Sequence, residues 1–163
     1  FERKSIRVGW PMEYLSTSLE QYRGMEKRDL ILFPHRIAPE KQIDIFYDLK
    51  EALPQYEFIV CQEQDLTKNE YHNLLGEAKM VFSANLQETL GISWYEGVLV
   101  DAIPMMPDRL SYSEMALDVF KYPNNWTDSF APVQPNGWPS AIAPPFTIII
   151  SWFKSNSRIT AKD

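Results

Sequence analysis

DLILF (29–33) is a continuous apolar run of strand length, and the turn that follows it leads into the helix-period segment APEKQIDIFYDLKEAL (38–53). Apolar residues recur in this segment at three-and-four spacing: Ile43, Phe46, Leu49 and Leu53. This spacing predicts an α-helix with one apolar face. Pro39 suits the first helical position, and Pro54 follows the expected end. A strand that is apolar throughout, followed by an amphipathic helix, is the unit from which parallel sheets are built.

The same alternation continues along the chain. EFIVC (57–61), MVFSA (80–84) and IPMM (103–106) predict three more buried strands. TKNE (67–70) has the form of a capping box and predicts the start of a helix, and a further helix is expected over roughly 89–101. Together these segments predict an α/β fold, a Rossmann-like open parallel sheet with helices on both faces.

The ends of the chain are less regular, so the sequence divides into three parts. Residues 1–27 are expected to form an interdomain linker with one short strand within 5–15, and residues 28–120 the Rossmann-like domain. Residues 121–163 read as an irregular Pro-rich tail, in which 146–153 could be an edge strand or a segment that packs on something outside the chain.

Composition excludes several classes of protein. The 163 residues carry 16 Lys and Arg against 22 Asp and Glu, a net charge of −6, which argues against a broad nucleic-acid or anionic-membrane face. The single Cys61 cannot form an internal disulfide, which fits a reducing compartment. The longest apolar run, FTIIISWF, is far shorter than the roughly 20 residues that span a bilayer. We therefore expect a soluble, cytoplasmic protein, and the start at Phe1 without a leader suggests a piece of a longer one.

The turn after the first strand carries two cations. Ligands of open parallel sheets bind outside the carboxyl ends of the strands. Arg36 lies in this turn and Lys41 five residues later, in the first turn of the expected helix, so both could point at one anion. The alternative is that Lys41, beside Glu40, is solvated surface.

The turn after the third strand leads into a helix and carries acidic residues. A helix N-terminus offers unpaired N–H groups to a phosphate, and Gly91 allows close approach of the backbone. Glu88 would stand at the mouth of the pocket. Glu96 follows eight residues later, near the same helix face about 12 Å along the axis, where it could accept hydrogen bonds from sugar hydroxyls. Taken alone, Glu96 reads as an exposed helix charge between Tyr95 and Gly97. Glu114, in a loop after the fourth strand, could face the same cleft or solvent.

The order of these residues resembles a known family. FPHRIAPEKQ is similar to a Gly-Arg-x4-Lys turn, SANLQETLGISWYEG to a Ser-x-x-Glu-x-Phe-Gly stretch, and VLVDAIPMMPDRLSYSE to a Glu-Ala-x-x-x-Gly-x-Pro-Val-Val segment. In this order the motifs resemble the C-terminal, donor-binding domain of a GT-B retaining glycosyltransferase of the "glycosyl transferases group 1" family. The likeness covers about residues 28–115. The stretches FPHR, SANLQETLGIS and PDRLSY also resemble phage-encoded members and, more distantly, the queuosine-tRNA mannosyltransferase-like branch.

The resemblance implies a role for each residue. Arg36 and Lys41 would bind the diphosphate of a UDP- or GDP-linked sugar and stabilise the charge that develops on it. The backbone of Thr89, Leu90 and Gly91 would bind the same diphosphate. Glu88 would hold hydroxyls of the transferred sugar, as the third residue of the catalytic set. Glu96 would hold the ribose, and the base would rest on the loop that begins at Gln62. The chain has no Asp-x-Asp motif, so we expect metal-independent hexosyl transfer with no cofactor.

The chain also departs from the family pattern. His35, Leu90, Gly97 and Asp101 stand where Gly, Phe, Ala and Gly are usual, and only Gln62 to Asn69 intervene where the family has a further strand and helix. The acceptor domain is expected to be missing, so the chain alone should bind a donor without transferring the sugar, to an unknown acceptor. The alternatives are a GT-B sugar-nucleotide epimerase and a noncatalytic nucleotide- or sugar-binding module.

Overall fold

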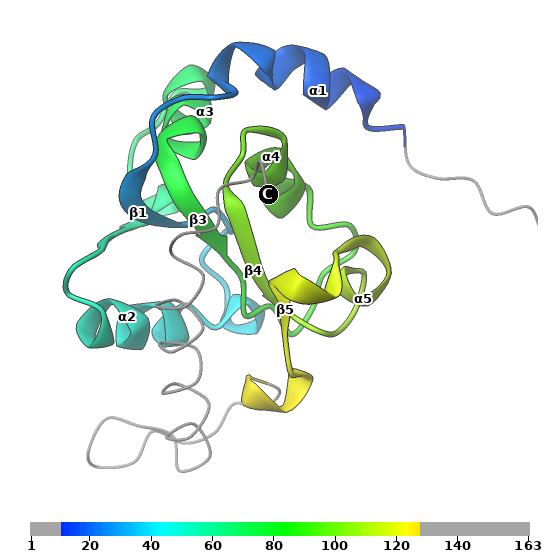
Figure 1. Ribbon diagram of the computed structural model, residues 1–163. Helices are drawn as coiled ribbons and strands as arrows, with labels where there is room; N and C mark the ends of the chain where they lie inside the picture. Colours follow the sequence, from blue (N-terminus) through cyan, green and yellow to red (C-terminus); the bar gives the residue numbers. More distant parts are fainter. Residues whose placement is uncertain (1–10, 128–163) are drawn as a thin grey trace, which may run out of the picture.

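The computed structural model describes residues 11–127, which form one layered α/β unit (Figure 1). The strands are β1 (Arg28–Phe33), β2 (Glu57–Val60), β3 (Ala78–Phe82), β4 (Ile103–Pro107) and β5 (Lys121–Tyr122). The α-helices are α1 (Glu13–Leu19), α2 (Ile43–Ala52), α3 (Lys68–Glu77), α4 (Ile92–Leu99) and α5 (Tyr112–Met115). Short 3-10 turns are η1 (Glu20–Tyr22), η2 (Pro39–Lys41), η3 (Cys61–Glu63), η4 (Asp118–Phe120) and η5 (Asn124–Trp126).

All five strands belong to one parallel sheet with the order β2-β1-β3-β4-β5. β1 pairs with β2 through Ile31 opposite Phe58 and with β3 through Ile31 opposite Met80. β3 in turn pairs with β4 through Val81 opposite Pro104. The fold class expected from the sequence is therefore confirmed, and each of the four strands predicted between residues 29 and 106 lies within two residues of its observed bounds.

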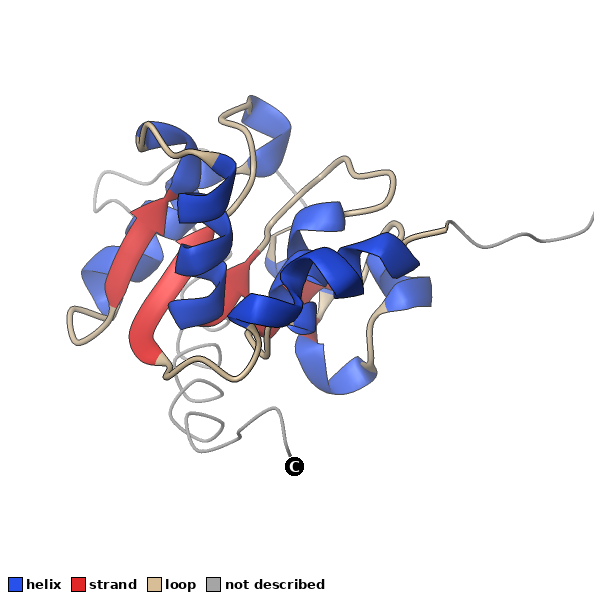
Figure 2. Ribbon diagram, turned by 90° about the horizontal axis from the view of Figure 1, so that it is seen from above, coloured by secondary structure: helices blue, strands red, loops and turns tan. Residues whose placement is uncertain are grey.

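Helices cover both faces of the sheet (Figures 1 and 2). On one face, Ile31 and Phe33 of β1 pack with Phe46 of α2. On the other face, Leu30 and Leu32 of the same strand pack with residues of α3 and α4. Successive strand residues point to opposite faces, so a central strand in this arrangement must be apolar at every position. This is why DLILF has no alternating pattern.

Two local features fix α3 and α4 on their face of the sheet. The predicted capping box is present, with Glu70 N donating to the Thr67 hydroxyl and Thr67 N donating to the Glu70 carboxylate. Gly97 brings α4 against β3, because a Cβ at this position would lie 2.9 Å from both methyl carbons of Val81. The absence of a side chain at Gly97 therefore allows a close contact between helix and strand.

The described part of the first 27 residues differs from the prediction. Residues 5–10, where the short strand before the Pro11 turn was expected, lie outside the described range, but 11–27 contain the helix α1 and the turn η1 where a polar connector was expected. Leu15 and Leu19, four residues apart, are buried and explain the helix. The other positions of α1 are mostly polar, so the sequence shows no clear apolar period.

The predicted irregular tail also begins with regular structure. β5 adds to the sheet edge, with Lys121 opposite Met106 and Tyr122 opposite Pro107. Lys121 Nζ lies 2.8 Å from the Asp118 carboxylate and 3.3 Å from the Asp108 carboxylate, which holds this short strand in register. The rest of the tail, including 146–153, lies outside the described residues.

The strand order creates a switch point. From β1 the chain crosses to β2 on one side and then to β3 on the other, so the strand order reverses at the carboxyl ends of β1 and β3, the position at which open α/β sheets bind ligands. The two turns singled out in the sequence leave these two strands. No helix within residues 11–127 is long and apolar enough to cross a membrane.

Candidate functional site

The turns after β1 and β3 are held together at the switch point. Leu86 N donates to the Glu40 carbonyl at 2.7 Å, which links the loop after β3 to η2. Gln42 follows η2 in the left-handed conformation, with φ of 51°. Its buried amide donates to the Ala84 carbonyl at 2.6 Å and to the Thr127 carbonyl at 2.7 Å. These bonds offset the strain of the left-handed residue and fix where the side chain of Lys41 begins.

Lys41 and Glu88 form the centre of the site. Lys41 Nζ lies 3.0 Å from Glu88 Oε2 and donates to the Gln87 carbonyl at 2.8 Å. The two side chains are only 8% and 17% exposed. The alternative that Lys41 is solvated surface is therefore wrong. An ammonium held this far from water, next to a carboxylate and beyond a strand end, is a group that can bind an anion.

Glu88 has two further hydrogen-bond donors. Asn85 Nδ2 donates to Glu88 Oε2 at 2.9 Å, and Thr89 N donates to Glu88 Oε1 at 3.0 Å. Burial alone would raise the pKa of Glu88, but the hydrogen bond and charge of Lys41, with the Thr89 N–H, hold the pKa of this carboxyl below its ordinary value. Glu88 is therefore ionised at neutral pH.

Asn85 is held in place by a buried polar cluster, which was not predicted from the sequence. Asn85 Nδ2 also donates to the Tyr112 hydroxyl at 2.8 Å, and this hydroxyl shares a 2.9 Å hydrogen bond with the Ser83 hydroxyl. All three residues are buried. The signal that could have found them is the polar pair Ser83 and Asn85 directly after the apolar run of β3, because polar residues that continue a buried strand must find partners.

His35 belongs to the same cluster. Its Nδ1 lies 3.3 Å from the Ser93 hydroxyl on α4 and 3.5 Å from Asn85 Nδ2. Burial, and then the charge of Lys41, lower the pKa of His35 to about 4. His35 is therefore neutral at physiological pH, and Nδ1 can accept the hydrogen bond that Ser93 donates. His35 thus ties the turn after β1 to the start of α4.

Arg36 does not join Lys41 at one anion in this structure. Its side chain is 67% exposed and forms an ion pair with Glu40, one turn away. The two cations of the turn therefore point at different carboxylates, Arg36 at Glu40 and Lys41 at Glu88. The diphosphate contact assigned to Arg36 stays a prediction.

Gly91 is required by the backbone at the start of α4. Its φ is 72°, a left-handed conformation that favours glycine. A Cβ there would lie 2.5 Å from the Trp94 ring and 2.8 Å from the Tyr112 ring. Leu90 beside it is half-buried. The geometry keeps the backbone of Thr89 to Gly91 close to the carboxylate of Glu88.

Glu96 is not on the same helix as Glu88. α4 begins only at Ile92, so Glu88 lies in the preceding loop and the predicted spacing of about 12 Å along one helix is wrong. The Glu96 carboxylate accepts a hydrogen bond of 3.0 Å from the Tyr71 hydroxyl of α3. Burial raises the pKa of Glu96, although the Tyr71 hydrogen bond opposes the shift. Glu96 is a partly buried carboxylate between α3 and α4 and not an exposed helix charge.

The remaining predicted residues lie on neighbouring loops. Gln62 in η3 accepts a hydrogen bond from Ile37 N, so the loop after β2 contacts the turn that carries Arg36. Glu114 is exposed on α5. Burial raises the pKa of the Cys61 thiol to about 12, which makes it a poor nucleophile.

Arg109, in the turn after β4, binds the backbone of the loop after β3. Its role was also not predicted from the sequence. Its guanidinium donates to the Asn85 carbonyl at 2.7 Å, the Ala84 carbonyl at 2.9 Å and the Thr127 hydroxyl at 2.8 Å. One side chain thereby fixes the backbone of the loop after β3. In the sequence, a single arginine in a loop does not indicate that its side chain will bind backbone carbonyls of another loop.

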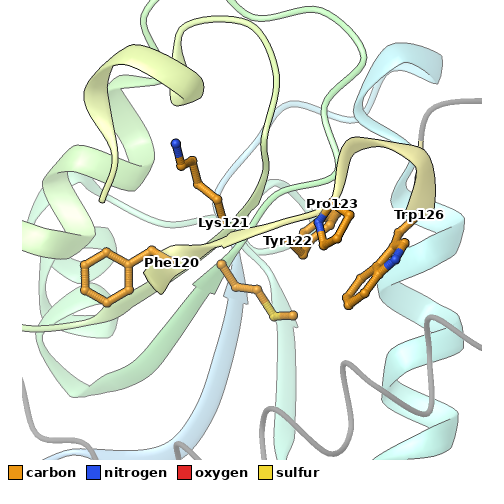
Figure 3. Close-up of a pocket in the computed structure, with 6 residues that line it drawn as sticks. Phe120, Lys121, Tyr122, Pro123 and Trp126 are labelled. Carbon is orange, nitrogen blue, oxygen red and sulfur yellow. The ribbon is translucent and has the colours of Figure 1, made fainter. Parts of the chain in front are cut away.

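A separate apolar pocket lies along β5 (Figure 3). It is lined by Met105, Phe120, Lys121, Tyr122, Pro123 and Trp126. The rings of Tyr122 and Trp126 are stacked with centroids 5.9 Å apart. None of the eight predicted site residues lines this pocket, so it is distinct from the β1/β3 site.

No protein-family model matches the sequence. No curated protein matches it either. Among solved structures, the chain is similar to the catalytic domain of starch synthase IV from Arabidopsis thaliana bound to ADP and acarbose. The TM-score is 0.48 at 11% identity, over 87% of this chain and 37% of that one, so the chain spans little more than a third of that protein's length. A likeness of this degree carries no argument, and the fold stands on the sheet order and register described above.

Proposed function

We propose that the chain binds a nucleoside-diphosphate sugar as the donor-binding part of a retaining, metal-independent GT-B glycosyltransferase. The observation that carries the proposal is the meeting of Lys41 and Glu88 at 3.0 Å. They come from two turns that are 47 residues apart in sequence and that the motif resemblance had already paired. Their meeting point is the switch point between β1 and β3, where open α/β sheets bind ligands.

In this proposal the diphosphate lies over the start of α4. The buried ammonium of Lys41 neutralises one phosphate, and backbone N–H groups of Thr89, Leu90 and Gly91 bind the other, helped by the partial positive charge of the helix N-terminus. The negative charge on the leaving diphosphate grows as the glycosidic bond breaks. A fixed ammonium in a partly dry site stabilises that charge more than water would.

Arg36 would complete the diphosphate site by changing partners. Its ion pair with Glu40 is largely exposed, and such pairs contribute only about 0–1 kcal/mol. A diphosphate is a stronger partner for a guanidinium, because it offers two charges and a bidentate geometry. The contact with Glu40 therefore presents a small barrier to the proposed role.

The carboxylates would bind the two sugars of the donor. Glu88 would accept hydrogen bonds from hydroxyls of the transferred sugar, and Glu96 from the ribose, because ionised carboxylates are acceptors only. The loop that begins at Gln62 contacts the turn after β1 and would support the base. The acceptor site would be supplied by an N-terminal domain outside these residues.

Calorimetric titration of the full chain with UDP, GDP, ADP and their sugars tests the proposal. We expect one nucleotide series to bind, and Lys41→Met to weaken that binding by about 30-fold or more, since a charge-assisted contact to phosphate is lost. Lys50→Met on the exposed face of α2 is the matched control, and it should leave binding unchanged. Absence of binding for every nucleotide would refute the proposal. Product analysis with an acceptor domain present would then separate a transferase from an epimerase or a noncatalytic module.

A further inference from the structure

In the free protein, one carboxylate occupies the middle of the β1/β3 site. Lys41 Nζ and Asn85 Nδ2 lie 3.0 Å and 2.9 Å from Glu88 Oε2, and Thr89 N lies 3.0 Å from Oε1. Lys41 comes from η2, and Asn85 and Thr89 come from the loop between β3 and α4. Both oxygens of the carboxylate are therefore bound by donors from different parts of the chain.

The donor set has the chemistry of a phosphate site. It combines an ammonium that is 92% buried, a fully buried amide and a backbone N–H close to the start of an eight-residue helix. Ammonium groups, amides and N–H groups near a helix N-terminus are the donors that bind phosphate oxygens in proteins. The Glu88 carboxylate is therefore a smaller anion bound to donors that suit a larger one, a phosphate.

We propose that Lys41, Asn85 and Thr89 N form a phosphate site that the Glu88 carboxylate occupies in the free protein, and that a phosphate ligand enters by displacing it. This inference rests on the proposed function in one respect, since the phosphate would be that of the donor's diphosphate. It adds Asn85 as a ligand-binding residue. It also makes Glu88 an internal competitor before it becomes a sugar ligand.

The charge of Glu88 supports the exchange. The Lys41 ammonium and the Thr89 N–H hold the pKa of Glu88 below its ordinary value against the effect of burial. The carboxylate is therefore an anion at neutral pH and competes with phosphate for the same donors. Once displaced, Glu88 is free to accept hydrogen bonds from the sugar attached to that phosphate.

The backbone around Glu88 makes few hydrogen bonds to other backbone groups. Among the described residues, Leu86 and Gly91 each make a backbone–backbone hydrogen bond, at 2.7 and 3.5 Å, but none involves residues 87–90. The polar contacts of this segment are those of the Glu88 carboxylate and the bond from Lys41 Nζ to the Gln87 carbonyl. Segments with few backbone hydrogen bonds are the ones that open at low free-energy cost. Displacing the carboxylate would release this segment without breaking the fold.

Titration of inorganic pyrophosphate into the full chain tests the exchange. We expect Glu88→Gln to bind pyrophosphate about tenfold more tightly than the unchanged chain, a difference of about 1.4 kcal/mol, because the neutral amide no longer competes for Lys41. Glu77→Gln is the matched control. It removes the same charge from an ion pair with Arg28 at the opposite end of β1, and it should not change the affinity.

Two additional measurements bear on the same inference. The gain must disappear in the double variant Lys41→Met/Glu88→Gln, because the site depends on the ammonium. If Glu88→Gln does not fold, the unchanged chain still gives an answer by NMR. Saturating pyrophosphate should shift the Thr89 amide signal strongly, since its acceptor changes from carboxylate to phosphate. Pyrophosphate binding that leaves this signal in place overturns the inference.

The outcomes separate this inference from the proposed function. If nucleotides bind in a Lys41-dependent manner but Glu88→Gln gains no affinity for pyrophosphate, the exchange is wrong and the proposed function stands. If Glu88→Gln gains affinity for pyrophosphate but no nucleotide binds, the phosphate site is supported and the proposed function is wrong. If neither pyrophosphate nor any nucleotide binds, both are refuted.

Discussion

The ion pair between Lys41 and Glu88 should contribute measurably to the stability of the fold. Its atoms are 3.0 Å apart and its side chains 8% and 17% exposed. At an effective dielectric constant of about 20, two charges about 4 Å apart attract by about 4 kcal/mol. Desolvation of both groups cancels part of this attraction. A coupling free energy of about 2 kcal/mol remains, within the range of hydrogen bonds to charged groups.

A double-mutant cycle with Lys41→Met and Glu88→Gln measures this coupling. We expect each single variant to lower the free energy of unfolding by about 2–3 kcal/mol, and the double variant to lower it by about 2 kcal/mol less than their sum. Urea unfolding of the full chain at neutral pH is the assay. The coupling should change little with salt, because a buried pair is poorly screened.

An exposed ion pair in the same sheet is the control. Lys79 Nζ lies 2.7 Å from Asp29 Oδ1, with side chains 23% and 64% exposed. The cycle Lys79→Met and Asp29→Asn should give a coupling below about 1 kcal/mol that falls further in salt. If the coupling of Lys41 with Glu88 is no larger than this, the site is not the low-dielectric environment described above.

The coupling should also depend on pH in a defined direction. The folded-state pKa of Glu88 lies below its ordinary value, so the unfolded chain binds its proton more readily. The stabilisation is complete above the ordinary pKa and is lost as the pH falls through the folded-state pKa. We therefore expect the coupling to be full at neutral pH and to decline only as the pH is lowered from the ordinary carboxyl pKa into the acid range. A coupling that stayed constant through this range would contradict the assignment.

Three further variants test local features by their free energies of unfolding in urea. Gly91→Ala should destabilise the chain by about 2–4 kcal/mol, because it adds left-handed strain to the clash of a Cβ with Trp94; an effect below about 1 kcal/mol would contradict the required backbone. Leu110→Gly should stabilise the chain by about 0.5 kcal/mol, because Leu110 is exposed and its φ of 56° is strained for a residue with a side chain. Leu117→Gly is the control at an unstrained φ of −67° and should destabilise the chain. Equal effects of the two variants would show that backbone strain is not the cause. Thr67→Ala should destabilise by about 1 kcal/mol through loss of the cap of α3, and no loss would show that the cap is dispensable.

Much of the fold could be predicted because its signals are local. The central strand DLILF is apolar on both faces, and TKNE carries its capping chemistry within four residues. Both features reflect interactions that the local sequence determines. The α1 helix was missed although Leu15 and Leu19 are buried, because two apolar residues among polar ones do not define a face. β5 was missed because two residues are too few for any period, and ion pairs with distant carboxylates hold it.

The site was predictable only in part, for a similar reason. Lys41 and Glu88 could be paired because each lies in a turn after a strand, and topology brings those turns together. Arg109 could not be identified, since its role depends on contacts made only in the folded chain, whereas Asn85 was signalled only by its place directly after a buried strand. Arg36 was assigned to the same anion as Lys41, but side-chain direction in an exposed turn is not determined by spacing in the sequence.

The location of the nucleotide is the most direct test of the account. Amide NMR signals of the full chain can be followed during titration with UDP and with GDP. We predict that the largest shifts for the nucleotide that binds fall in residues 34–42 and 83–93, the two turns at the switch point, and that Lys41→Met abolishes them. Largest shifts in residues 120–126, around the apolar pocket of Figure 3, would contradict the account, as would a chain that shows no shifts with either nucleotide.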